Sequence, residues 1–194
     1  MGNQASALRP EVLTDLEEST AFNADEIREY YRNFLKECPE GRMSMSRDQF
    51  KKIYSKLFPT GDANQFAQHV FRTYDRDGNG RIDFREFLNS LHIQKRGTLE
   101  EKLTWLFKMY DIDGTGYITE DELGQMLKSL HNLRGKVDEH SMKCLANYIL
   151  ERADINKDKK LSLKEFLEGA KCSNTIKQML DEAFEASTTP FRKS

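Results

Sequence analysis

Long apolar runs and a cysteine framework are both missing from this chain of 194 residues. No apolar stretch approaches the roughly 18–20 residues that a membrane-spanning helix needs, which argues against an integral helical membrane protein. The first residues also lack the basic and then apolar layout of a secretory signal. The three cysteines are odd in number and far apart, so we expect reduced thiols in a cytoplasmic protein.

A charge excess of one sign and a catalytic motif are also absent. The 30 basic and 32 acidic side chains leave a formal net charge of −2, which does not favour a nucleic-acid partner. No nucleophile–base arrangement or Gly-rich phosphate loop is found, and the four histidines show no zinc-motif spacing with the cysteines. We therefore expect no enzymatic activity.

Acidic side chains instead concentrate in three short loops. The first, DRDGNGRIDFRE, fits the spacing D-x-[DN]-x-[DN]-G-x5-E at every position. This spacing suits a hard cation, because Ca²⁺ takes oxygen ligands from loop positions 1, 3, 5, 7, 9 and 12. Gly80 stands at a turn that residues with a Cβ resist. The ligands expected here are Asp75, Asp77, Asn79, the Arg81 carbonyl, Asp83 and both carboxylate oxygens of Glu86.

The same plan recurs twice in the second half. DIDGTGYITEDE keeps glycine at the turn, whereas DINKDKKLSLKE carries Lys159 there. A side chain in a left-handed conformation costs roughly 1 kcal/mol or more, so we predict that this last loop fills last. The ligands expected in the second loop are Asp111, Asp113, Thr115, the Tyr117 carbonyl, Thr119 and Glu122. Those expected in the third are Asp154, Asn156, Asp158, the Lys160 carbonyl, Ser162 and Glu165.

A fourth copy of the unit has lost its ligands. Apolar residues at helical spacing flank each acidic loop, and the same spacing surrounds the stretch ECPEGRMSMSRDQF. This stretch lies near residue 39, one repeat of 36 residues (111 − 75) before Asp75. Pro39 is expected to distort the turn, and Arg42 and Arg47 bring positive charge where oxygen ligands would be needed. We therefore expect this loop to pair with the Asp75 loop and bind no metal. The apolar residues at loop position 8 are expected to form short paired strands: Ile82, Ile118 and Leu161.

These motifs make the chain similar to the neuronal calcium sensor family of EF-hand proteins, in particular its hippocalcin, neurocalcin and visinin-like branch. The residues that carry the resemblance are MGNQAS, LRPEVLTDL, FLKECPEG, FKKIYSKLFPTGDA, HVFRTYD and GRIDFREF. We therefore predict an all-α fold of four EF-hand units in two pairs, with loop–loop β pairing and a C-terminal helix. The expected divisions are an N-terminal acylated segment and short helix (1–20), pair 1 (21–93), a linker (94–98), pair 2 (99–173) and a C-terminal helix and tail (174–194).

The resemblance also implies a function. It predicts a sensor of about three Ca²⁺ ions, with Mg²⁺ as a candidate in the resting state, hinge glycines at Gly41 and Gly97, and reversible membrane association through a myristoyl group. The sequence supports acylation independently, since Met1-Gly2-x-x-x-Ser6 is the myristoylation pattern, with Gly2 the acylated residue. The implied partners are amphipathic helices of receptors, kinases, cyclases or channels, bound by a monomer or a weak homodimer. The groove residues that we expect are Tyr30, Phe34, Tyr54, Phe84 and Leu88.

Other interpretations stay open at this stage. A calcium buffer has similar loops but scarcely opens on binding, and the aromatic residues assigned to the groove would then be plain core. A third class is a regulatory subunit that stays bound to its channel at low Ca²⁺. The C-terminal run from Ile176 to Phe184 either occupies the groove as a built-in competitor or packs on the second pair.

Overall fold

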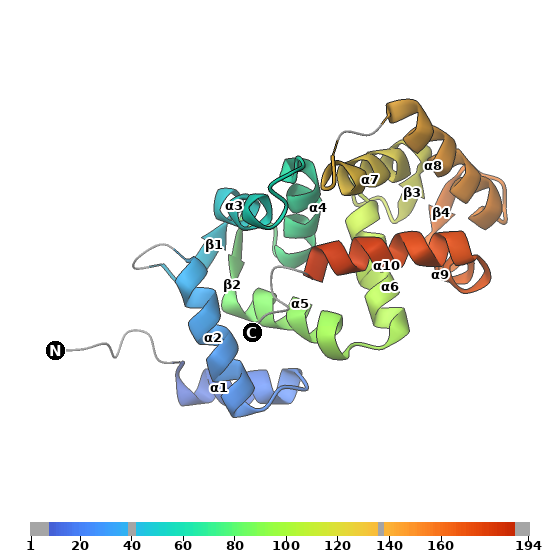
Figure 1. The fold of residues 1–194 in the computed structure, drawn as a ribbon. Helices are drawn as coiled ribbons and strands as arrows, with labels where there is room; N and C mark the ends of the chain where they lie inside the picture. The colour runs from blue at the N-terminus through green and yellow to red at the C-terminus, as the bar shows by residue number, and fades with distance from the viewer. Residues whose placement is uncertain (1–7, 39–41, 136–137, 189–194) are drawn as a thin grey trace.

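The computed structural model describes residues 8–38, 42–135 and 138–188, and within them the chain forms ten helices and two small antiparallel sheets (Figure 1). The predicted all-α EF-hand fold is therefore confirmed. The first half contains α1 (Pro10–Ser19), α2 (Ala24–Glu37), β1 (Ser44–Ser46), α3 (Arg47–Leu57), α4 (Asn64–Tyr74), β2 (Arg81–Asp83) and α5 (Phe84–Arg96). The second half contains α6 (Leu99–Tyr110), β3 (Tyr117–Thr119), α7 (Glu120–Asn132), α8 (Glu139–Ala153), β4 (Lys160–Ser162), α9 (Leu163–Cys172) and α10 (Asn174–Thr188).

Short strands join the four loops in two pairs, as the sequence predicted. β1 pairs antiparallel with β2 and places Met45 opposite Ile82, while β3 pairs with β4 and places Ile118 opposite Leu161. All four side chains are buried in the core. Each pair of loops is thus held from inside by an apolar contact that requires no metal.

The strand register also shows how the first loop aligns with the others. Since Met45 stands opposite Ile82, Cys38 falls at position 1 and Gln49 at position 12. Burial raises the pKa of the Cys38 thiol to about 11, so this position offers no anionic ligand. Pro39 and Gly41 lie outside the described residues. This loop therefore has no carboxylate at position 1 or at position 12, the first and last ligand positions.

Side-chain caps determine where most helices begin. Capping boxes, in which the N-cap and N3 side chains bond each other's backbone N–H, start α2 at Asn23, α5 at Asp83, α6 at Thr98, α7 at Thr119 and α9 at Ser162. In three of these helices the N3 residue is also the glutamate at loop position 12. The first loop keeps the box with Ser46 and Gln49, so its exiting helix begins in the same way without a carboxylate.

The connection between the two pairs is shorter than expected. We predicted a linker over residues 94–98, but α5 continues to Arg96 and only Gly97 and Thr98 separate it from α6. The Gly97 N–H donates to the carbonyls of His92 and Ile93, which ends α5. A Cβ at Gly97 would lie 2.4 Å from the Ile93 carbonyl oxygen, so the chain can turn this tightly only with glycine.

The last helix returns from the second pair toward the first. α10 follows α9, crosses α6 and ends beside α5 (Figure 1). Its Phe184 ring packs edge-on against Trp105, and near its end the Ser187 carbonyl accepts a 2.6 Å hydrogen bond from the Tyr54 hydroxyl. α10 therefore contacts both pairs, and Tyr54 of the first pair lies beneath its end.

Candidate metal centres

The loop from Asp75 to Glu86 gathers three carboxylates. Asp75, Asp77 and Glu86 each offer an oxygen within 4.8 Å of the others. Asp75 Oδ2 accepts the Gly80 N–H at 3.0 Å, while its Oδ1 is buried and has no hydrogen-bond partner among the described residues. A buried carboxylate oxygen without a donor is unfavourable unless a cation supplies the missing charge. The residues therefore fit a divalent cation with oxygen ligands.

Glu86 ties the two ends of this loop together. One of its oxygens accepts the Arg76 and Asp77 N–H groups at 2.8 and 3.3 Å, and the other accepts the Asp83 N–H at 3.0 Å. Burial raises the pKa of Glu86, although these hydrogen bonds act in the opposite direction. The first turn of α5 is thereby anchored to the segment that follows α4.

The loop from Asp111 to Glu122 repeats this arrangement. Asp111, Asp113 and Glu122 again place one oxygen each within 4.8 Å of the others. Glu122 accepts the N–H groups of Ile112, Asp113 and Thr119, and also the Thr119 hydroxyl. The hydrogen bonds from the Thr115 side chain and backbone lower the pKa of Asp113, which favours the charged form that a metal ligand needs.

The third loop has the same scaffold but a strained backbone. Glu165 accepts the Ile155, Asn156 and Ser162 N–H groups, and Asp154 accepts those of Lys157 and Lys159. Both lysines are left-handed, with φ of 62° and 63°, where the other two loops have glycines. Sequence reasoning identified the backbone strain at Lys159, but at Lys157 it considered only the positive charge and missed the strain. An alignment of the three loops would have found it, since Gly78 and Gly114 occupy position 4 in the others.

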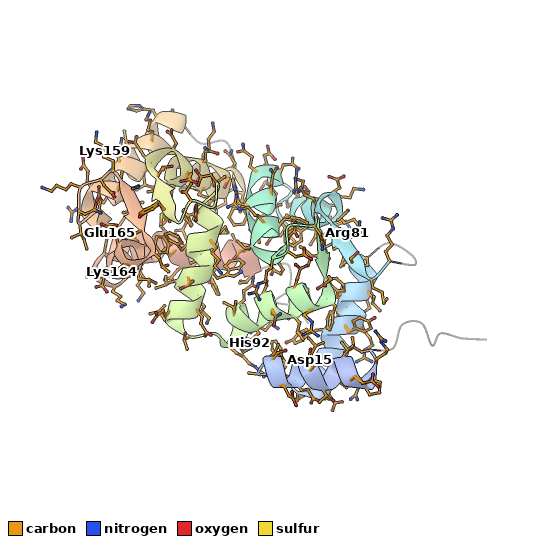
Figure 2. The ribbon with its side chains drawn as sticks, turned by 180° about the vertical axis from the view of Figure 1, so that it is seen from behind. Asp15, Arg81, His92, Lys159, Lys164 and Glu165 are labelled. Atoms are coloured by element: carbon orange, nitrogen blue, oxygen red, sulfur yellow. The ribbon has the colours of Figure 1, made fainter. Side chains whose placement is uncertain are left out.

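The charge of the third loop also differs. Position 3 is Asn156, and within the described part of the chain no third group of three carboxylates comes together at the spacing found in the other loops. Figure 2 shows Lys159, Lys164 and Glu165 at the end of the molecule away from Asp15. Burial tends to raise the pKa of Glu165, but hydrogen bonds from Ser162 and the loop backbone outweigh it and lower the pKa.

The five residues predicted to line a target groove are all buried, and contacts within the set are seen for Phe34 and Phe84. Phe34 and Phe84 pack with ring centroids 5.6 Å apart, and Tyr54 lies under the end of α10. Tyr30 contacts Phe22, which lies between α1 and α2. All five side chains are buried: Tyr30, Phe34, Tyr54, Phe84 and Leu88. The predicted acylation site, Gly2, lies outside the described residues.

Arg72 joins the two pairs, and nothing in the sequence singled it out. Its guanidinium, from α4, donates to the carbonyls of Met109 and Ile112 at 2.9 Å and to those of Asp111 and Lys108 at 3.2 and 3.3 Å. Burial lowers the pKa of Arg72, whereas nearby Asp111 and Glu122 raise it. A cation at the C-terminal end of α6 satisfies carbonyls that have no partner within the helix.

No helix in the described part of the chain combines the length and apolarity needed to cross a bilayer. Residues 41–94 and 100–171 each match the family described as an EF-hand domain pair. The chain is 41% identical over 185 residues to a protein named neuronal calcium sensor 1 from Lymnaea stagnalis, covering 93% of this chain and 96% of that protein. It is 36% identical over 188 residues to recoverin from Homo sapiens, covering 93% of each.

Proposed function

Since the chain belongs to the neuronal calcium sensor family of EF-hand proteins, we propose that it senses Ca²⁺ by binding three ions and regulates membrane-associated targets through an acylated N-terminus and an apolar groove. The observation that carries the proposal is the pair of carboxylate clusters, one of which holds the buried, unpartnered Asp75 Oδ1. The third ion is assigned to the Asp154 loop, which keeps the same hydrogen-bond scaffold.

The position-12 glutamates are the residues that would transmit binding to the helices. Bound Ca²⁺ supplies positive charge to the carboxylate clusters. Glu86 belongs to the carboxylate cluster and is also the N3 residue of α5. In addition, its carboxylate accepts the backbone N–H of Arg76, in the segment that follows α4. A change in its position therefore changes the placement of α5 relative to α4. Phe84 and Leu88 lie on α5 and would move with it.

The target groove requires such a movement, because its lining is buried in this structure. Helix-in-groove recognition needs a continuous apolar lining with anchor sites along it. Tyr54 is covered by the end of α10 and Tyr30 is packed against Phe22. Displacement of either cover would expose aromatic surface to an amphipathic helix of a partner.

Membrane attachment is proposed to need both the acyl group on Gly2 and bound Ca²⁺. A single myristoyl chain gives marginal binding, with an association constant of about 10⁴ M⁻¹, so a second signal is required. Three divalent ions would shift the formal charge from −2 to +4 (−2 + 6), which favours anionic lipid. Acylated wild type should sediment with anionic liposomes only in Ca²⁺, and Gly2→Ala should remain in the supernatant. Equal sedimentation of the two proteins would refute the acyl anchor.

A calcium buffer is the alternative that the burial of the groove side chains favours. Buffers scarcely open on binding, whereas sensors expose apolar surface. Fluorescence of a hydrophobic dye, measured with the full acylated chain at saturating Ca²⁺ and in chelator, separates the two. A strong increase with Ca²⁺ supports the sensor, and an unchanged signal together with three bound ions supports the buffer.

A further inference from the structure

Two potential metal ligands lie together on α8, away from the three calcium loops. His140 and Cys144 are one helical turn apart, and both are exposed to solvent. α8 packs against α7 and α9 of the second pair (Figure 1). The Asp138 carboxylate accepts the Ser141 N–H at 2.9 Å and so caps the helix on which both side chains stand.

The separation of the two ligand atoms is the informative measurement. Cys144 Sγ lies 3.6 Å from His140 Nε2. Zinc binds thiolate at about 2.3 Å and imidazole nitrogen at about 2.0–2.1 Å, so two such ligands on a tetrahedral ion lie about 3.5–3.6 Å apart. The pair therefore already has the sulfur–nitrogen spacing that a zinc ion would impose.

From this geometry we propose that His140 and Cys144 form a binding site for Zn²⁺, separate from the calcium loops. A thiolate and an imidazole favour zinc over Ca²⁺, which takes oxygen ligands. No third His, Cys, Asp or Glu among the described residues joins the pair at ligand spacing, so water completes the coordination. Binding releases the thiol proton to the buffer, and the affinity rises with pH for that reason.

The sequence did not reveal this pair, because structural zinc motifs carry three or four ligands and this one has two. The ordinary interpretation of the same distance is a hydrogen bond between thiol and imidazole, which involves no metal. The two interpretations differ in what added metal does to the thiol. The test therefore follows the sulfur atom directly.

Cobalt reports thiolate ligation through a near-ultraviolet charge-transfer absorption that oxygen ligands do not produce. The full chain, with its loops saturated by excess Ca²⁺, is titrated with Co²⁺ and then with Zn²⁺. We expect the band to appear and Zn²⁺ to abolish it. Cys144→Ser and His140→Ala should both lack the band. Cys172→Ser, which removes another exposed thiol, is the matched control and should keep it.

Alkylation followed by mass spectrometry gives a second measurement. Zn²⁺ should slow alkylation of Cys144 at least tenfold in wild type but not in His140→Ala, while Cys172 reacts at an unchanged rate in both. Because both substitutions lie on an exposed helix face, they leave the core intact. Absence of the cobalt band in wild type, its persistence in Cys144→Ser, or equal protection of Cys144 and Cys172 would overturn the site.

Discussion

At the scale of single residues, the third calcium loop is strained in a way that the other two are not. Lys157 and Lys159 adopt φ near +60°, where Gly78, Gly80, Gly114 and Gly116 stand in the other loops. A left-handed conformation costs an L residue with a Cβ roughly 1–2 kcal/mol. The two lysines therefore make this loop the least favourable one to close.

Replacing Lys159 by glycine should relieve part of this strain. We expect Lys159→Gly to tighten Ca²⁺ binding at the Asp154 loop about fivefold, which corresponds to roughly 1 kcal/mol. Lys159→Gln is the matched control, since it removes the charge and keeps the Cβ. Calorimetry that finds equal gains in the two variants would show that charge, and not backbone strain, weakens this loop.

His69 gives the protein a pH-dependent stability. Its side chain is 9% exposed, its Nδ1 has no partner among the described residues, and burial with Arg72 nearby lowers its pKa to about 4. In the unfolded chain the imidazole of this histidine is protonated with the ordinary pKa of about 6.5. Between pH 6.5 and 4 the unfolded state thus binds more protons, and stability falls as the pH falls.

We expect the calcium-free protein to lose about 2 kcal/mol of unfolding free energy through His69 between pH 7.5 and pH 5. His69→Gln should lack this contribution, so the difference in unfolding free energy between wild type and the variant should shrink as the pH falls toward 5. Urea denaturation at several pH values measures it, with exposed His140→Gln as the control. Parallel pH profiles for wild type and His69→Gln would contradict the prediction.

At the scale of single elements, each calcium loop and its exiting helix share one residue. Glu86, Glu122 and Glu165 belong both to a loop and to the capping box of α5, α7 or α9. Gln49 has the same capping role in α3 without a carboxylate. The capping and metal-binding roles of this position can therefore be separated by exchanging glutamate for glutamine.

Glu86→Gln and Glu122→Gln should each remove one bound Ca²⁺, because an amide supplies only one neutral oxygen. Helix content should persist, since glutamine can still accept the capping hydrogen bond. Native mass spectrometry counts the ions and circular dichroism follows the helices. Gln49→Glu is the reverse control and should add no ion. A fourth specific ion in wild type, abolished by changes between Cys38 and Arg47, would refute the assignment of three.

At the scale of the whole molecule, several features join the two EF-hand pairs. Among them are the two-residue turn at Gly97 and Thr98, the Arg72 guanidinium on the carbonyls of α6, and α10. Arg72 lies three residues before Asp75 and bonds the carbonyls of Asp111 and Ile112. Arg72 thus links the helix that leads into the Asp75 loop to the first residues of the Asp111 loop.

Arg72→Gln should lower the unfolding free energy of the calcium-free protein by about 1–3 kcal/mol, because four carbonyls, three of them in part-buried hydrogen bonds, lose a charged donor. Arg32→Gln, on the exposed face of α2, is the matched control and should change it little. Chemical denaturation measures both. A loss in Arg72→Gln no larger than that in the control would show that these bonds contribute nothing to the joining of the pairs.

The end of α10 is expected to compete with targets for the groove. Removal of residues 186–194 deletes Ser187, whose carbonyl bonds Tyr54, but keeps the part of α10 that packs on α9 and α6. This truncation should raise the affinity for an amphipathic target peptide at saturating Ca²⁺ and leave the ion count unchanged. Fluorescence anisotropy of a labelled peptide measures the affinity. Unchanged affinity would leave α10 with a packing role only.

The sequence by itself determined the features that depend on local spacing. The four helix-loop-helix units, the strand residues at loop position 8 and the loss of ligands in the first loop all follow from residues close together in the chain. Family membership followed from the same motifs. Each of these features brings together residues that are near one another in the chain, which costs little conformational entropy. A pattern of about a dozen residues is therefore enough to specify each one.

Only the tertiary structure decided the contacts between distant residues. The Tyr54–Ser187 hydrogen bond spans 133 positions and the Arg72–Ile112 bond spans 40, and no periodicity in the sequence encodes either. The burial of the expected groove has the same origin, because α10 and the segment around Phe22 reach it from outside its own helices. Which side chains meet across the fold depends on how whole helices pack, and that packing is a property of the complete molecule.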